Sequence, residues 1–142
     1  MDKRYIFLDV DGVLNRNETE ETMCGYPGID DNLASLLKEM IERTGALVIL
    51  TSTWREDKNA LGYLKDRLSE YGVFIYDVID GNNKNSRAEE IGSYLSEHPE
   101  IAKYVILDDE KPSEDLKDRW IRTALSTGLI PSDTEAAVTI LN

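Results

Sequence analysis

The fold is decided by the stretch Phe7-Leu8-Asp9-Val10-Asp11-Gly12-Val13-Leu14-Asn15 near the start of the chain. Its apolar beginning extends back to Tyr5 and is typical of a strand buried on both faces. Asp9 and Asp11 follow at the end of this strand, two residues apart, so their side chains leave on the same side. Carboxylates this close repel each other unless a cation or a shared proton compensates them. The stretch therefore predicts a metal site, and Gly12 allows the backbone to turn sharply beneath it.

Three further apolar runs resemble buried strands and cover residues 46–50, 73–76 and 104–107. Residues 119–124 are a candidate for a last strand. Amphipathic helical spacing separates these runs over residues 33–41, over residues 60–68, and in a segment that starts at Ser86, which has capping-box spacing to Glu89. Asp30 or Asp31 is expected to cap the first helix and Gly45 to follow its end. Ser132 and Glu135 predict another capping box, for a helix over residues 135–141.

Strands that alternate with helices predict an α/β fold, a Rossmann-like parallel sheet sandwiched by helices. The chain has 142 residues, which fits a single domain over residues 1–142. In such a sheet, ligands bind at the carboxyl ends of the strands. Residues 15–31 are the longest candidate for irregular structure near the first strand.

Composition excludes several classes of function. The formal net charge of −12 disfavours nucleic-acid binding through a broad basic surface, although local basic patches stay compatible with it. Cys24 is the only cysteine, which excludes an intramolecular disulfide and a cysteine zinc cluster. No apolar run is long enough to span a bilayer, so we expect no membrane contact and a cytoplasmic location. The sequence does not fix an oligomeric state.

A second acidic pair, Asp108-Asp109, closes the apolar run at residues 104–107. In a parallel sheet both acidic pairs would reach the same edge, where four carboxylates would converge. Such hard oxygen ligands suit Mg²⁺, which binds one or two carboxylates and keeps positions for water and phosphate. For either pair alone, the alternative is a solvated turn or a helix cap.

The run at residues 46–50 ends in hydroxyl side chains at Thr51, Ser52 and Thr53. Hydroxyls and free backbone amides at a strand-to-helix junction make a phosphate cradle, with Thr51 as the first candidate. The alternative for Ser52 and Thr53 is to cap the helix that follows. Lys84 and Arg87 flank Ser86 at a helix start, where one of them would place a cation on the phosphoryl oxygens unless it is simply solvated.

These motifs, in this order, resemble the four motifs of the haloacid dehalogenase (HAD) superfamily, and the resemblance covers nearly the whole chain. More narrowly, the segments 7–15, 50–55, 87–91, 106–109 and 127–133 resemble the phosphatase-like HAD domains of multidomain "Swiss army knife" RNA-repair proteins. The last of these segments, Thr-Gly-Leu-Ile-Pro-Ser-Asp, is the weaker match. In this superfamily the first aspartate of the motif, here Asp9, is the nucleophile. An aspartate two residues later, here Asp11, fits phosphate transfer rather than dehalogenation.

The resemblance implies a role for each motif residue. Asp9 would attack phosphorus to give an aspartyl-phosphate, and Asp11 would protonate the leaving oxygen and then activate water. Thr51 would bind the phosphoryl group, and Arg87 best matches the family's basic position, with Lys84 close enough to replace it. Mg²⁺ would be held by Asp9, the backbone carbonyl of Asp11, Asp108 and Asp109.

No cap-sized insertion interrupts the motifs, so the chain resembles a capless HAD phosphatase whose open site admits large substrates. RNA-repair similarity favours a nucleic-acid end or a nucleotide as the phosphorylated substrate. Further substrate contacts are expected from Gly12, Ser52, Arg16 and Arg55, with Trp54 and Lys58 nearby. The competing hypothesis is a non-catalytic module that binds phosphate or metal and serves regulation or partner docking. Phosphotransfer to an acceptor other than water is a third.

Overall fold

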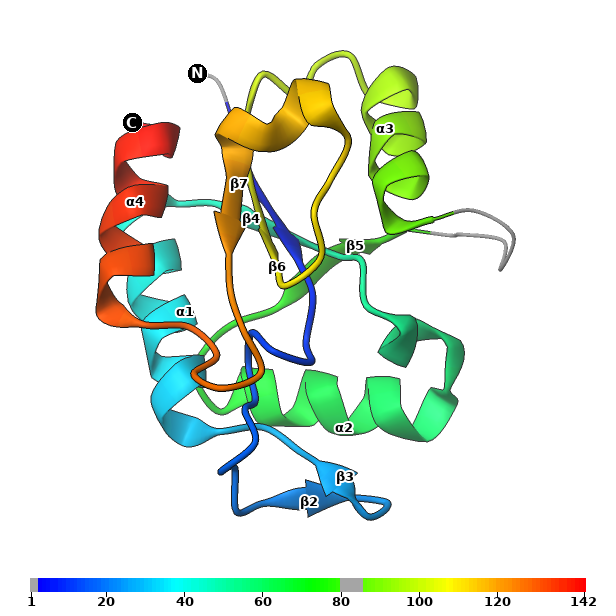
Figure 1. The fold of residues 1–142 in the computed structure, drawn as a ribbon, viewed down its shortest axis with the longest axis vertical. Helices are drawn as coiled ribbons and strands as arrows, with labels where there is room; N and C mark the ends of the chain where they lie inside the picture. The colour runs from blue at the N-terminus through cyan, green and yellow to red at the C-terminus, as the bar shows by residue number, and fades with distance from the viewer. Residues whose placement is uncertain (1–2, 80–85) are drawn as a thin grey trace.

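A five-stranded parallel sheet forms the centre of the molecule, in the order β5-β4-β1-β6-β7. The computed structural model describes residues 3–79 and 86–142. Its strands are β1 (Arg4–Leu8), β4 (Leu47–Leu50), β5 (Ile75–Val78), β6 (Lys103–Asp108) and β7 (Trp120–Arg122). Because every pairing in this sheet is parallel, the carboxyl ends of all five strands share one edge (Figure 1).

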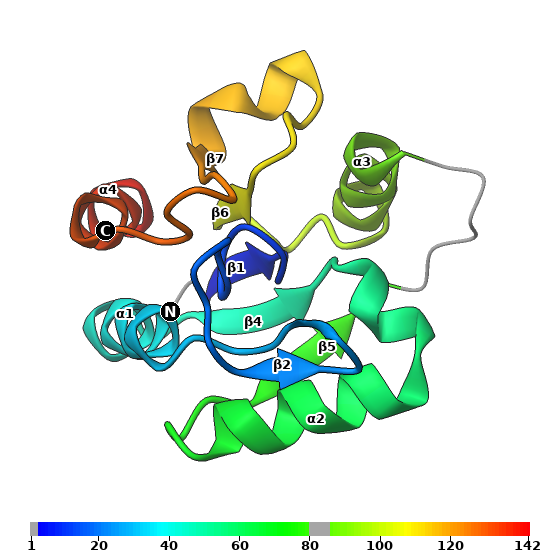
Figure 2. The ribbon, with the colours of Figure 1, turned by 60° about the horizontal axis from the view of Figure 1, so that its bottom comes forward.

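Helices cover both faces of this sheet, because successive side chains of β1 point to opposite faces and all of them are apolar from Tyr5 to Leu8. Ile6 and Leu8 join one buried cluster with α1 (Asp31–Thr44), α2 (Lys58–Ser69) and α4 (Pro131–Leu141). Tyr5 and Phe7 join a second cluster with α3 (Arg87–Glu97) and the 3₁₀ helix η2 (Glu114–Arg119). Figure 2 shows α1 and α4 on one side of the sheet and α3 on the other. The predicted Rossmann-like α/β sandwich is therefore confirmed.

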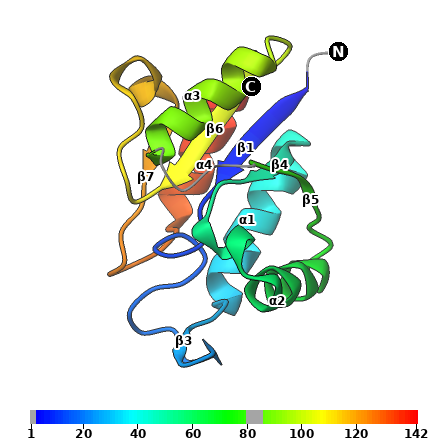
Figure 3. The same cartoon turned by 90° about the vertical axis from the view of Figure 1, so that its right-hand side faces the viewer.

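A β-hairpin occupies part of the segment expected to be irregular. Its strands are β2 (Thr22–Met23) and β3 (Tyr26–Pro27), and they pair only with each other. Cys24 and Gly25 make the turn, with φ of 54° and 83°. The hairpin projects beyond the carboxyl ends of the strands (Figure 3). This hairpin is the largest structured insertion between β1 and α1. After β4, the 3₁₀ helix η1 (Thr53–Glu56) leads directly to α2. The described residues therefore contain no sizeable cap domain.

Several boundaries differ from the prediction, for example the last strand, which covers Trp120–Arg122 rather than residues 119–124, and two of the differences have a clear cause. The third strand starts at Ile75 rather than Val73, because the Val73 amide donates to the Leu68 carbonyl (3.0 Å) and so closes the end of α2. The last helix starts at Pro131, where proline needs no amide partner, and not behind a Ser132 cap. The carboxylate of Asp133 accepts the Ile130 amide (3.0 Å) and stabilises this start.

The starts of α1 and α3 agree with the predicted caps, whereas α2 is capped by Asp57, which was not predicted. The carboxylate of Asp30 accepts the Asn32 amide at the start of α1, and Gly45 follows the end of that helix in the left-handed region. The hydroxyl of Ser86 accepts the Glu89 amide at the start of α3. Within the described part of the chain, none of the helices combines the length and apolar character needed to cross a bilayer.

Candidate active site

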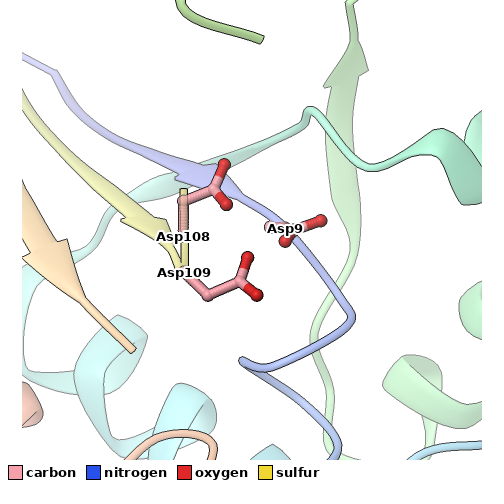
Figure 4. Close-up of side chains that lie close together, drawn as sticks. All are labelled: Asp9, Asp108 and Asp109. Atoms are coloured by element: carbon pink, nitrogen blue, oxygen red, sulfur yellow. The ribbon is translucent and has the colours of Figure 1, made fainter. Parts of the chain in front are cut away.

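Three carboxylates meet at the carboxyl edge of the sheet. Asp9 follows β1, Asp108 ends β6, and Asp109 comes next; one oxygen from each lies within 4.8 Å of the others (Figure 4). Neighbouring strands bring them together, since β1 and β6 pair along their length and the Asp9 amide donates to the Leu107 carbonyl (3.0 Å). Asp9 and Asp108 are buried, whereas Asp109 is exposed.

Arg87 is the cation closest to this cluster among the ion pairs of the described residues. Its Nη1 lies 2.6 Å from Oδ2 of Asp108 and 3.4 Å from Oδ1 of Asp9. Burial, the largest cause, and the neighbouring Asp108 charge raise the pKa of Asp9 to about 8, although the Arg87 charge and a backbone hydrogen bond act in the opposite direction. Burial also raises the pKa of Asp108. One guanidinium therefore leaves two buried carboxylates incompletely compensated.

A divalent cation fits this cluster. Carboxylate oxygens are hard ligands of the kind that Mg²⁺ prefers, and the negative charge left by Arg87 is what such an ion would neutralise. Asp9, Asp108 and Asp109 are the side chains that would hold it. The carboxylate of Asp11 is not a member of this group of three.

The carboxylate of Asp11 is held separately by two donors. Nδ2 of Asn15 donates to its Oδ1 (2.9 Å), and the indole Nε1 of Trp54 donates to its Oδ2 (3.2 Å). Asn15 also accepts the Gly12 amide (3.0 Å) through Oδ1, which fixes the turn that carries Asp11. The roles of Asn15 and Trp54 were not predicted. The only sequence signal was the short spacing of Asn15 after Asp11, because Trp54 lies 43 residues away.

Gly12 occupies a position that disfavours a side chain. Its φ is 80°, and a Cβ atom there would lie 3.1 Å from Oδ2 of Asp109. A residue with a side chain would be strained by the backbone conformation and would press on a carboxylate of the cluster.

Thr51 and Ser52 are buried where β4 ends, next to β1. The Thr51 hydroxyl donates to the Leu8 carbonyl (3.1 Å). The Ser52 hydroxyl accepts the Trp54 amide (3.1 Å) and so caps η1, which is the alternative role expected for this residue. This bond leaves the hydroxyl hydrogen of Ser52 available to a ligand.

The basic residues predicted to bind substrate have different surroundings. The Arg55 guanidinium is buried and donates to the carbonyls of Thr51 (2.5 Å) and Ser52 (3.1 Å) and to Oε2 of Glu90 (2.5 Å). It therefore braces the fold, and substrate contact would require breaking these bonds. Arg16 is half-buried and pairs with Asp30 (3.1 Å). Lys58 is exposed at the start of α2, and Lys84 lies outside the described residues.

The strand order and the positions of these residues define the class of protein. Asp9 and Asp11 follow the central strand β1. Thr51 follows β4 on one side of it, and Asp108 and Asp109 lie at the end of β6 on the other side, while Arg87 starts α3. This is the arrangement of a HAD-like domain. Residues 5–134 match the family described as the HAD domain in Swiss Army Knife RNA repair proteins. Since the match spans most of the chain, the protein belongs to that family. Comparisons with curated proteins and with solved structures gave no match.

Proposed function

We propose that the protein is a Mg²⁺-dependent phosphatase that hydrolyses a phosphomonoester through an aspartyl-phosphate on Asp9. The observation that carries this proposal is the cluster of Asp9, Asp108 and Asp109, with Arg87 on its buried side. A buried carboxylate beside a guanidinium and two further metal-ligating carboxylates is suited to attack a phosphoryl group whose charge is neutralised around it.

The reaction has two steps on the side chains of this chain. In the first, an Asp9 oxygen bonds to phosphorus, the bond to the leaving oxygen breaks, and Asp11 gives its proton to that oxygen. In the second, Asp11 takes a proton from water, the water oxygen bonds to phosphorus, and the bond to Asp9 breaks. Free phosphate leaves and both aspartates return to their starting state. Mg²⁺, when bound, supplies positive charge for the phosphoryl oxygens.

The phosphoryl oxygens would contact residues at the ends of β4 and the start of α3. Ser52 supplies a hydroxyl donor there, and Arg87 supplies a guanidinium; the Thr51 hydroxyl would have to turn from the Leu8 carbonyl to donate to the phosphoryl group. Gly12, which lacks a Cβ, leaves the Asp109 carboxylate uncrowded at this point. The strong pairing of Arg87 with Asp108 supports Arg87, rather than Lys84, in the basic position.

The favoured substrate is a nucleotide or a nucleic-acid end. The family's occurrence in RNA repair proteins supports this choice. The net charge of −12 disfavours long-range attraction of a polynucleotide, so the contacts would concentrate on the phosphorylated end. The competing function is a module that binds phosphate or metal without turnover. The orientation of Asp11 by two donors favours catalysis over that alternative, because simple binding does not need a positioned acid.

Phosphate release from an aryl phosphate and from 3′- and 5′-phosphorylated oligonucleotides tests the proposal. We expect release with Mg²⁺, none with EDTA, and at least a roughly 1,000-fold loss in Asp9→Asn. Asp66→Asn, an exposed aspartate on α2, is the matched control and should keep full activity. Activity retained in Asp9→Asn would reject the mechanism; inactivity of the unmodified protein on every substrate would favour the binding module.

A further inference from the structure

A groove opens beside Asp11, on the side of the hairpin. Its volume is about 560 Å³, and we call it the Asp11 groove. Apolar side chains contribute much of its wall: Met23, Tyr26, Trp54 and Leu125. Asp11 and Asn15 also line it, so the groove reaches the carboxylate that is bonded by Asn15 and Trp54.

The position of the groove identifies which part of a substrate it would hold. Asp9, Asp108 and Asp109 are not among its lining residues, whereas Asp11 is. In the proposed reaction Asp11 gives its proton to the leaving oxygen, so the group attached to that oxygen must lie on the Asp11 side. The phosphoryl group would therefore sit at the acidic cluster and the leaving group in the Asp11 groove.

The hairpin wall of this groove is held in place at its base. Nδ2 of Asn15 donates to the Pro27 carbonyl (3.1 Å), and the Gly28 amide donates to the Glu21 carbonyl (2.8 Å). The Tyr63 hydroxyl accepts the Ile29 amide (2.9 Å). Asn15 therefore contacts both the catalytic acid and the hairpin, which couples the position of the wall to the position of Asp11.

A second backbone contact holds another part of the groove wall, formed by Asn17 and Leu125. The Asn17 amide donates to the carbonyl of Leu125 (2.8 Å), whose side chain is 48% exposed in the groove wall. The walls are thus formed without a ligand, so a bound group would not have to order them.

The chemistry of the walls favours a planar, uncharged ring. Tyr26 is 72% exposed, which leaves its aromatic ring available for stacking, and Trp54 lines the same groove. The carboxylates of Asp11 and Asp57 line the groove and disfavour an additional anionic group. Among the described residues that line the groove, Arg16 is the one cation, and it pairs with Asp30. The volume is in the range that holds a group of nucleoside size.

We propose that the Asp11 groove is the leaving-group subsite and binds the nucleoside of the phosphorylated residue, with the base stacked on Tyr26. This inference rests on the proposed function and narrows its substrate class. A free nucleotide and the terminal residue of an oligonucleotide share this chemistry, so both are included in the test.

Matched substrates with and without a base test the subsite by kinetics. Adenosine 5′-monophosphate is compared with ribose 5-phosphate, and 3′- or 5′-phosphorylated oligonucleotides are compared with versions whose terminal residue is abasic. We expect kcat/KM to be about tenfold higher when the base is present, as stacking of one base predicts. Tyr26→Ala should remove this preference by lowering kcat/KM on the substrates that carry a base, whereas Tyr26→Phe should keep it.

Phe74→Ala is the control for loss of an exposed ring. Phe74 is also 72% exposed but precedes β5, at the amino ends of the strands, and does not line the groove. The Phe74→Ala variant should therefore keep the preference for substrates that carry a base. Equal rates on the paired substrates, or an equal loss on both in Tyr26→Ala, would overturn the subsite while leaving the phosphatase proposal intact.

Binding separates the subsite from the proposed function. Calorimetry with the Asp9→Asn protein and Mg²⁺ should show adenosine 5′-monophosphate binding about tenfold more tightly than ribose 5-phosphate, a difference lost in Asp9→Asn/Tyr26→Ala. If the unmodified protein releases no phosphate but this difference is found, the subsite is supported and the phosphatase proposal is rejected. Equal affinities, or no nucleotide binding, would reject the subsite.

Discussion

The indole nitrogen of Trp54 donates a hydrogen bond to Oδ2 of Asp11 over 3.2 Å. This contact joins the loop after β1 to the 3₁₀ helix after β4. Together with the Asn15 contact to the other oxygen, it fixes the orientation of the carboxylate that would deliver the proton. The orientation of the acid therefore depends on a residue that does not touch the acidic cluster.

Trp54→Phe tests this dependence. Phenylalanine keeps a ring near Tyr63 but lacks the indole donor, so Asp11 would lose one of its two fixed contacts. We expect kcat to fall about tenfold on an alkyl phosphate, whose leaving oxygen needs a proton. On p-nitrophenyl phosphate, whose leaving group needs little protonation, the fall should be much smaller. Equal losses on both substrates would indicate a general disturbance of the site.

The buried carboxylate pair predicts an unusual pH dependence of stability. Burial and the neighbouring Asp108 raise the folded-state pKa of Asp9 to about 8, above its unfolded value. A raised carboxyl pKa means that the folded state holds the proton more tightly, so this group stabilises the metal-free fold at low pH. That contribution is lost as pH rises from about 4 to 8.

Denaturant unfolding in EDTA measures this effect as a difference between two proteins. Asp9→Asn removes the ionisable group and leaves Arg87 paired with Asp108. The free energy of unfolding of Asp9→Asn, minus that of the unmodified protein, should increase with pH between about 4 and 8. Saturating Mg²⁺ should raise the stability of the unmodified protein more at pH 8 than at pH 5.5. A pH-independent difference would contradict the assignment to Asp9.

Gly12→Ala should weaken the metal site through Asp109. The new Cβ would lie 3.1 Å from Oδ2 of Asp109, and the backbone φ of 80° adds strain. We expect a stability loss of about 1 kcal/mol and about tenfold weaker activation by Mg²⁺, read from activity against Mg²⁺ concentration.

Gly45→Ala separates the two causes. Gly45 has φ of 71°, but a Cβ there would meet no atom within 4 Å. It should lose a similar amount of stability without any change in Mg²⁺ activation. If Gly12→Ala behaves in the same way, the approach to Asp109 has no functional effect.

The buried pair of Arg55 and Glu90 should contribute to both stability and activity. Their side chains are 5% and 10% exposed, and the pair links the loop that carries Thr51 to α3, which carries Arg87. Glu90→Gln would leave a buried guanidinium without its counter-charge, at a cost of about 3 kcal/mol. Chemical denaturation measures this loss. Phosphate affinity should also fall, because the two elements that we propose to bind phosphate lose a contact that holds them together.

Glu135→Gln provides the exposed counterpart. Glu135 makes two bonds to Arg43, of 2.7 and 3.1 Å, but its side chain is 67% exposed. We expect little change in stability. A comparable loss in both variants would show that burial does not decide the strength of the Arg55–Glu90 pair.

The strands in the centre of the sheet were predictable from sequence, because a short, continuous apolar run is typical of a strand whose two faces are both buried. The edge strand β5 was displaced by two residues, since Val73 looks like strand but its amide completes the end of α2. The hairpin was not predicted because each of its strands has only two residues, too few for an alternating pattern.

The candidate site shows a similar division. The acidic residues stand out because each pair ends an apolar run, and parallel pairing of β1 and β6 makes their meeting predictable. The contacts of Trp54 with Asp11 and of Arg55 with Glu90 join residues 43 and 35 positions apart. Such contacts depend on how loops pack, which a single sequence does not encode in any local pattern.

The hairpin has a consequence for how this protein can change. Its tip, at residues 23–26, contributes no side chain that is fully buried, while its base is held by backbone contacts. The fold should therefore tolerate substitutions of the exposed Tyr26, whereas Met23 packs against the core cluster. The group that the proposed subsite accepts could therefore be altered through Tyr26 alone, without any change at the strand ends that carry the acidic cluster.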